Sequence, residues 1–484
     1  MIDDIKDSGE KKSPVSFDQI EQAEREAHGL KPIDKIVMRR VYKLKVSYKK
    51  SKKRIRLEGQ KVRRKRRIFL AVIIICFLIF GGFLIARTRF FQTLLFVYKL
   101  RHGSYLVGFQ NSAELRPTGG FWGSFAVVDV PGNIQKSTIL FDTNPYKKDN
   151  LLLKETNVPL PGPMVETYPN RPQSFINANW SVDFREAAKT LEWYFGLGWD
   201  KKIDGVVGIS SLSVIDLLKL IGPVTLKDGT VVISDNFTQI MSQKIDVEYW
   251  QDPENIQANE PKTVLFELVP EIIAKTKKQP AMTLYRFLVS QMEEGRIVTY
   301  FNDPAKQKLS EGFGISGELN PYSVDYLAIN NTNLNGGKTS LNVDQSIDYA
   351  VSTDAGKTVA DLTIKRTHRA NTWPEILNRN YTRVFAPLGS KLVSIDQTGD
   401  MPIPTVDTND ELGRTSFGFW FSTSSGEEKT THLKYELPVN LKNPANYSLV
   451  LQKQPGTLVD NINITAFGNN LYVGNFDQNL IKLR

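Results

Sequence analysis

The sequence predicts a single transmembrane helix followed by an α/β layered ectodomain and a C-terminal all-β sandwich. Three observations lead to this prediction. An uncharged apolar run occupies residues 68–86, segments with strand and helix patterns alternate after it, and short strands with period-two alternation follow residue 337. At 484 residues the chain has room for two or three folded units.

The pattern divides the chain into five parts. We expect a basic cytoplasmic tail at 1–67, a transmembrane helix at 68–87, an amphipathic stalk at 88–102, an α/β ectodomain at 103–337 and a β-sandwich domain at 338–484. The single Cys excludes a disulfide-stapled scaffold and a Cys-rich zinc module.

The basic excess of the chain lies in the tail. The whole chain has 62 Lys and Arg against 52 Asp and Glu, whereas residues 1–67 alone have 22 against 10. Such a basic run neutralises the phosphates of nucleic acid or of lipid head groups. Because an apolar run follows it directly, we expect a lipid bilayer with anionic head groups as the partner of the tail, rather than nucleic acid.

The apolar run IFLAVIIICFLIFGGFLIA at residues 68–86 contains 19 residues. At about 1.5 Å per residue it extends ~28 Å, close to the ~30 Å hydrocarbon core of a bilayer. A buried soluble helix would need protein on all of its sides. The basic cluster before the run predicts a cytoplasmic N-terminus, so we expect residues after 87 to be extracytoplasmic at the cell membrane.

The elements of the ectodomain follow in order. Residues 88–101 have apolar side chains at helical spacing, which predicts an amphipathic stalk or a surface helix. Strands are expected at 105–109, 125–130 and 203–209, and helices at 182–195, 211–221, 261–277 and 281–294. After the glycine pair at 336–337, strands are expected at 361–365, 381–385, 432–437, 447–452 and 461–465.

The segment Gln110–Gly123, QNSAELRPTGGFWG, is the motif with the most chemical content. Its proline and glycines allow a tight loop whose backbone N–H groups face one concavity. The Arg116 guanidinium and the Thr118 hydroxyl would then hold a phosphate or another oxyanion, with Gly119 and Gly120 shaping the loop. The alternative is a stiff hairpin in which Glu114 and Arg116 neutralise each other.

Five motifs in this order resemble a bacterial envelope family known as domain of unknown function 4012. They are Ala113–Phe121 (AELRPTGGF), Asp204–Ile209 (DGVVGI), Leu217–Val224 (LLKLIGPV), Tyr300–Pro304 (YFNDP) and Asn330–Lys338 (NNTNLNGGK). The resemblance covers roughly residues 103–400. It implies a single-pass membrane protein with a basic N-terminus and assigns no reaction.

The order of elements from 182 to 224 also distantly resembles the LytR-CpsA-Psr ligases. That resemblance implies transfer of a polyprenyl-linked glycopolymer to the cell wall, with arginines and a divalent metal such as magnesium holding the pyrophosphate. Arg116 and Asp183 are then the catalytic candidates. The ligand-binding candidates are Asn111, Glu114, Arg116, Thr118, Gly119, Gly120 and Arg185. The aspartate of the ligases' Arg-x-Asp-Thr loop is missing here, and Asp183 is also placed to cap a helix.

Two functions therefore stay open. The first is an extracytoplasmic cell-envelope protein that binds an anionic phosphate-bearing or glycan ligand and transfers lipid-linked glycopolymer to the wall. The second is a non-catalytic envelope anchor or assembly module. A conventional hydrolase or NTPase is disfavoured, because the sequence has no G-x-S-x-G elbow, P-loop or H-E-x-x-H motif.

Overall fold

The structure is a computed structural model. It describes scattered positions of residues 19–29, most of residues 39–56, residue 68, and residues 88–483 except the segments 134–135, 143–144, 153–155, 200, 259, 320–323, 370–376, 400–403 and 439–446. The chain divides into two units, residues 1–92 and 93–484. In the first unit, residues 42–54 are helical and almost all exposed.

The predicted fold class needs a correction in its first part. Among the described residues, no helix has both the length and the apolar character that a bilayer crossing requires. Helix α3, Arg89–Leu100, has 12 residues and extends only about 18 Å at 1.5 Å per residue. The predicted span at 68–87 lies, apart from Ile68, outside the described residues. The fold that the structure supports is a mixed α/β region followed by a region rich in β-sheet, and the location at the cell membrane stays a prediction.

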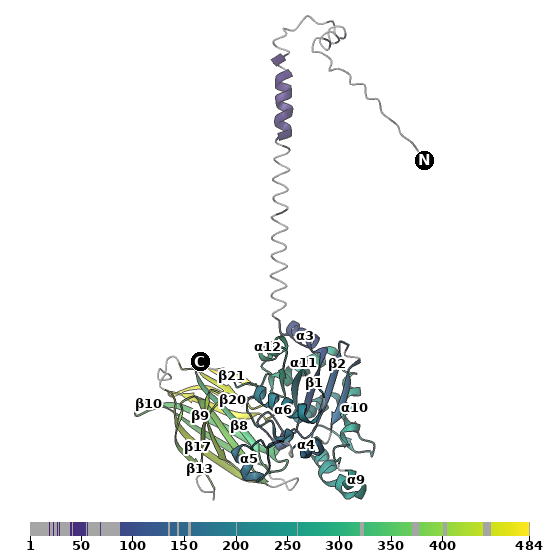
Figure 1. Cartoon of the computed structure of the whole chain (residues 1–484). Coiled ribbons are helices and arrows are strands. Elements are labelled where there is room, and N and C mark those ends of the chain that lie inside the picture. The colour runs from purple at the N-terminus through teal and green to yellow at the C-terminus, as the bar shows by residue number, and fades with distance from the viewer. Residues whose placement is uncertain are drawn as a thin grey trace. The chain divides into compact units, whose positions relative to one another are not determined.

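A five-stranded sheet forms the centre of the α/β region (Figure 1). Its order is β3-β2-β1-β4-β7, with bounds Thr138–Asp142, Phe125–Pro131, His102–Gln110, Gly205–Ser210 and Ile297–Phe301. β1 and β4 are parallel, and the remaining neighbours are antiparallel. The hairpin β1–β2 is joined by the segment 111–124, which contains the one-turn 3-10 helix η1, Ser112–Glu114.

Helices cover both faces of this sheet because its strands are apolar on both sides. One face carries Leu106 and Val206 and packs with α6, Phe184–Gly198. The other face carries Tyr105 and Phe301. It packs with α3, α11 (Ala281–Glu293) and α12 (Pro304–Phe313). The helices α4, Tyr146–Leu152, and α5, Gly162–Thr167, lie in the connection from β3 to α6.

A smaller helical segment follows β4 and has its own core. It contains α7 (Ser211–Ile221), the hairpin β5–β6 (Val224–Thr225 and Val231–Val232), α8 (Phe237–Ser242), a π-helical turn (Gln243–Val247), α9 (Pro253–Ala258) and α10 (Leu265–Thr276). Leu218, Phe237, Leu268 and Ile272 are buried against one another in this core. Ser210 caps α7 by accepting a hydrogen bond from the N–H of Leu212 at 3.1 Å.

Two six-stranded sheets make up the C-terminal region (Figure 1). One has the order β13-β17-β10-β9-β19-β20, with bounds Lys391–Gln397, Glu428–Glu436, Lys357–His368, Val343–Asp354, Asp460–Ala466 and Asn469–Phe476. The other has the order β14-β15-β12-β8-β18-β21, with bounds Asp407–Glu411, Arg414–Trp420, Asn380–Pro387, Asp325–Asn333, Leu449–Gln452 and Leu480–Leu483. A short pair, β11 (Leu377–Asn378) and β16 (Thr423–Ser424), completes the region.

The two large sheets share one buried core, to which Ile347, Leu362, Phe417 and Leu433 contribute. Alternate residues of each strand face this core, as in a sandwich. The strand β8 pairs with β12 and β18 of this region although it ends before residue 337. The sandwich strands therefore begin before the predicted boundary at 337/338.

Candidate functional site

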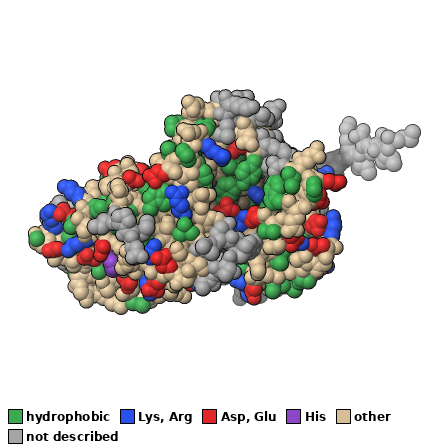
Figure 2. All heavy atoms as spheres, turned by 90° about the horizontal axis from the view of Figure 1, so that it is seen from below, with side chains coloured by type: hydrophobic (Ala, Val, Ile, Leu, Met, Phe, Trp, Pro, Cys, Tyr) green, Lys and Arg blue, Asp and Glu red, His purple; other side chains and the backbone are tan. Residues whose placement is uncertain are grey.

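A pocket lies where the central sheet meets the helical segment. Its volume is about 530 Å³, within the ~300–1,000 Å³ range of small-molecule sites. Most of its wall is apolar, and the wall includes Phe109, Phe141, Ile209, Met241, Leu265 and Ile272. Figure 2 shows a hollow on one face of the molecule that is lined by hydrophobic side chains, with charged side chains beside it.

The apolar wall follows from the local sequence. β1 and β4 end at the pocket, so Phe109 and Ile209 project from neighbouring strand ends. On α10, Leu265, Leu268 and Ile272 recur at spacings of three and four and lie on one side of the helix. The pocket thus lies between the carboxyl ends of two inner strands of the sheet and an amphipathic helix.

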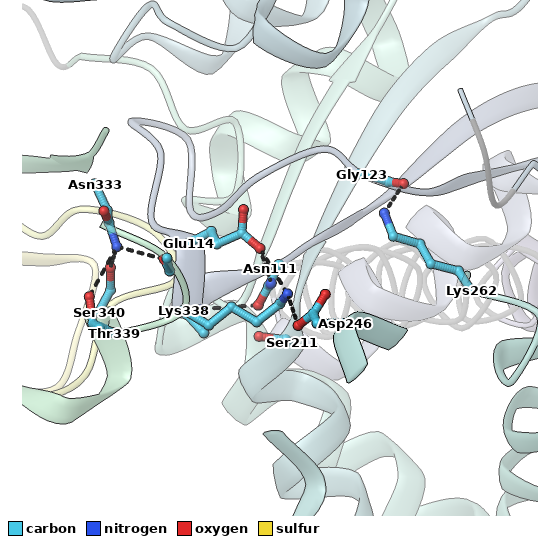
Figure 3. Close-up of polar contacts among 12 residues, drawn as sticks. Asn111, Glu114, Gly123, Ser211, Asp246, Lys262, Asn333, Lys338, Thr339 and Ser340 are labelled. Atoms are coloured by element: carbon cyan, nitrogen blue, oxygen red, sulfur yellow. Dashed lines mark hydrogen bonds and ion pairs between the residues drawn. The ribbon is translucent and has the colours of Figure 1, made fainter. Parts of the chain in front are cut away.

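A polar group forms one part of the pocket wall (Figure 3). The Lys338 Nζ atom contacts Asp246 and lies 3.5 Å from the Glu114 Oε1 atom. The Asn111 side-chain amide donates to the same Glu114 oxygen at 3.1 Å. The Ser211 hydroxyl accepts from the N–H of Ser112 at 3.0 Å. Lys338 thus neutralises two carboxylates that come from different segments.

A second lysine lines the pocket apart from this group. In Figure 3 Lys262 points to the Gly123 carbonyl oxygen, to which its Nζ atom donates. The amine also lies 5.4 Å from the centre of the Tyr146 ring. Burial lowers the pKa of Lys262 to about 8, because the protein replaces much of the water around the ammonium. Burial likewise raises the pKa of the Tyr146 phenol, so this hydroxyl stays protonated near neutral pH.

The structure separates the predicted site residues of the 110–123 loop. Asn111 and Glu114 line the pocket. Arg116 is 5% exposed, and its Nη1 atom donates to the Asn333 and Leu115 carbonyl oxygens. It therefore connects the loop to β8 instead of facing the pocket.

The other loop residues are also enclosed by protein. The Thr118 hydroxyl donates to the Gln110 Oε1 atom at 2.7 Å and accepts from the Asn179 amide at 2.9 Å. The carbonyl oxygens of Gly119 and Gly120 accept from Ser112 and Asn179, both at 2.9 Å. The Gly119 and Gly120 carbonyls and the Thr118 hydroxyl thus have partners within the protein. An oxyanion site on this loop stays a prediction.

Asp183 and Arg185 lie at the start of α6, outside the pocket wall. The Asp183 carboxylate accepts from the N–H groups of Arg185 at 2.9 Å, Glu186 at 3.3 Å and Leu319 at 3.0 Å, which is the capping role expected as the alternative. Burial raises the pKa of Asp183 despite these hydrogen bonds. Arg185 forms an ion pair with Glu311 at 2.8 Å and also contacts Glu318.

A metal site is not formed by the residues that the structure describes, since no three His, Cys, Asp or Glu side chains gather in that part of the chain. A divalent metal such as magnesium thus stays a prediction from the resemblance to the ligases.

The sequence of the α/β region gives one family match. Residues 102–245 match the family DUF4012, described as a protein of unknown function. This segment belongs to the DUF4012 family. It begins at β1 and ends within the π-helical turn, so it includes the 110–123 loop and much of the pocket wall.

The DUF4012 match confirms the first resemblance but assigns no activity to the chain. It ends before two of the five motifs, at 300–304 and 330–338. No curated protein matches the chain. The resemblance to the LytR-CpsA-Psr ligases has no support in this match. The cell-wall and glycopolymer role that the second resemblance implies is therefore withdrawn, because a match to a family of unknown function provides no basis for it.

Sequence reasoning missed the pocket residues Tyr146, Asp246, Lys262 and Lys338. Lys338 ends a polar Asn-Gly-rich motif that is equally typical of a linker. Lys262 follows a proline and precedes the apolar positions of α10, which is the only local signal that a lysine enters apolar surroundings.

Proposed function

We propose that the DUF4012 segment, together with α10 and Lys338, binds a small molecule with a large apolar portion. The observation that supports this most directly is the pocket of about 530 Å³ with a mostly apolar wall. Burying apolar ligand surface there contributes roughly 25 cal/mol per Å² before the cost of association.

The pocket is a different position for the ligand from the one that the sequence predicts. The sequence predicts an oxyanion site on the 110–123 loop, with the Arg116 guanidinium as its charged group. Arg116 is buried against Asn333 and exposes little surface to a ligand. The pocket offers a ligand more accessible surface than the Arg116 side chain does. The proposal is a binding function and contains no reaction.

A cavity-filling variant tests the proposal. Val269 on α10 lines the pocket and is partly exposed, so Val269→Phe places extra carbon atoms in the ligand volume. Val231 on β6 is 49% exposed and lies outside the pocket wall, so Val231→Phe is the matched control. Binding of 1-decanol to the full-length protein is measured by isothermal titration calorimetry.

We expect Val269→Phe to weaken decanol binding by about tenfold or more, which corresponds to ~1.4 kcal/mol, while Val231→Phe leaves it unchanged. The melting temperature of both variants should stay within a few degrees of the wild type. Decanol that binds all three proteins equally would place the ligand elsewhere, and an absence of binding to the wild type would refute the function.

A further inference from the structure

Among the described residues, four charged side chains line the pocket, and three of them are already paired. Lys338 contacts Asp246 and lies 3.5 Å from Glu114. These two carboxylates and this lysine form the polar group on one part of the wall (Figure 3). A ligand charge placed against this group would have to compete with the existing ion pairs.

The fourth charged side chain is Lys262. In the part of the chain that the structure describes, its amine donates to the Gly123 carbonyl and forms no ion pair. Tyr146 offers an aromatic face at 5.4 Å, which stabilises a cation only weakly compared with a carboxylate or phosphate. An ammonium in this position has lost water without forming an ion pair, and the pocket carboxylates Glu114 and Asp246 act on it only over a longer distance.

The start of α7 adds to the preference for a negative ligand group. Ser210 and Ser211, the cap and the first residue of this 11-residue helix, both line the pocket. The N-terminal end of a helix carries a partial positive charge. This effect supplements the charge of Lys262 and is not a separate site.

We propose that Lys262 binds the anionic head group of a ligand whose apolar chain occupies the pocket. The ligand class is a long-chain amphiphile with a single carboxylate or phosphate group. This inference rests on the proposed function, because the apolar chain must enter the pocket for the head group to reach the amine.

Gly123 gives the amine its position. A Cβ atom at this residue would overlap the Lys262 Nζ atom and would lie 2.9 Å from the Phe121 ring. Gly123→Ala therefore displaces the amine without removing its charge. Since the groups displaced, the amine and the Phe121 ring, belong to side chains and not to the backbone, we expect the fold to tolerate the change.

Four decyl compounds with one chain and different head groups test the inference on the full-length protein. They are 1-decanol, decanoate, decyl phosphate and decyltrimethylammonium, each titrated below the concentration at which it forms micelles. The variants are Lys262→Gln, Gly123→Ala and the control Lys275→Gln. Lys275 also donates to a backbone carbonyl, that of Pro223, but lies outside the pocket wall.

We expect the wild type and Lys275→Gln to bind decanoate or decyl phosphate about tenfold more tightly than decanol. Lys262→Gln should reduce the anions to the affinity of decanol and leave decanol itself unchanged. Gly123→Ala should weaken the anions in the same direction. The tighter of the two anions then identifies the head group as carboxylate or phosphate.

Two results would overturn the role of Lys262 while preserving the apolar pocket. One is decanol binding with no preference for the anions, or with a preference for the cation. The other is an anion preference that persists in Lys262→Gln and Gly123→Ala. If no decyl compound binds the wild type, the proposed function fails together with this inference.

Discussion

Replacing Asp325 by Asn should change how the stability of the protein depends on pH. Asp325 is fully buried at the start of β8. Its Oδ2 atom accepts from the hydroxyls of Tyr349 at 2.9 Å and Tyr447 at 2.5 Å, and its Oδ1 atom accepts from the N–H of Tyr326 at 2.7 Å. Burial outweighs these hydrogen bonds and raises the pKa of Asp325 from 3.8 to about 6.

The size of the effect follows from this difference in pKa. A carboxyl whose pKa is higher in the folded state contributes stability below its unfolded pKa, and this stability is lost as the pH rises through the folded pKa. At about 1.4 kcal/mol per pKa unit, the Asp325 carboxyl removes ~3 kcal/mol from the unfolding free energy in full, of which about 2 kcal/mol is lost between pH 4 and pH 7. Asn does not titrate, so Asp325→Asn removes this loss.

Urea unfolding followed by circular dichroism at several pH values from 4 to 7.5 measures the difference. The control is Asp361→Asn, a change at an exposed position of β10. We expect the stability difference between the wild type and Asp325→Asn to shift by about 2 kcal/mol in favour of the variant across this range, while Asp361→Asn parallels the wild type. Curves of wild type and Asp325→Asn that stay parallel would show that burial does not control this carboxyl.

Three substitutions in predicted site residues should affect folding more than binding. Arg116→Ala should lower the unfolding free energy by ~2–4 kcal/mol, because it removes a buried donor to Asn333 and leaves a cavity. The affinity for decanol should change less than twofold. A large loss of affinity at unchanged melting temperature would instead make Arg116 a ligand contact. Gly120→Ala should cost ~2–4 kcal/mol by thermal unfolding, because φ is 157° and a Cβ would lie 2.5 Å from the backbone of Asn111; a wild-type melting temperature would contradict this geometry. Asp183→Ala should cost ~1 kcal/mol through loss of the α6 cap, and an equal stability for variant and wild type would show that the cap contributes nothing.

Local sequence patterns predict the elements around the site well. The helix expected at 182–195 corresponds to α6, Phe184–Gly198, whose cap is the carboxylate of Asp183. The strand expected at 203–209 corresponds to β4, Gly205–Ser210. The helix expected at 211–221 corresponds to α7, Ser211–Ile221, which Gly222 terminates. The start and end of each of these elements depend on residues next to them in the chain, so local sequence patterns are enough to predict them.

The position of the loop residues depends on contacts that no local pattern reveals. Arg116 and the glycines after it are typical of an anion site. Its hydrogen bond, however, goes to the carbonyl of Asn333, which lies more than two hundred positions later in the chain. The second half of β8, Asn330–Asn333, is polar and lacks the period-two alternation of a half-buried strand, yet all residues of β8 are buried. Several of its side chains form hydrogen bonds across segments, such as the amide of Asn330 to the Pro117 carbonyl at 3.1 Å.

The polar character of the 110–123 loop therefore has a structural cause. The loop lies between the α/β region and the sandwich, where the Gln454 amide donates to the Arg116 carbonyl at 3.1 Å and the N–H of Asn333 donates to the Leu115 carbonyl at 2.9 Å. The loop's side chains add further bonds, since Arg116 donates to the Asn333 carbonyl and the Thr118 hydroxyl accepts from the Asn179 amide. Apolar residues at these two positions would remove these buried hydrogen bonds, at a cost of about 1–3 kcal/mol each. The same contacts fix the loop so that Glu114 reaches Lys338 from the sandwich side. The residues that resemble an anion site thus build the junction, and they leave Lys262 as the pocket's one cation with no carboxylate partner among the described residues.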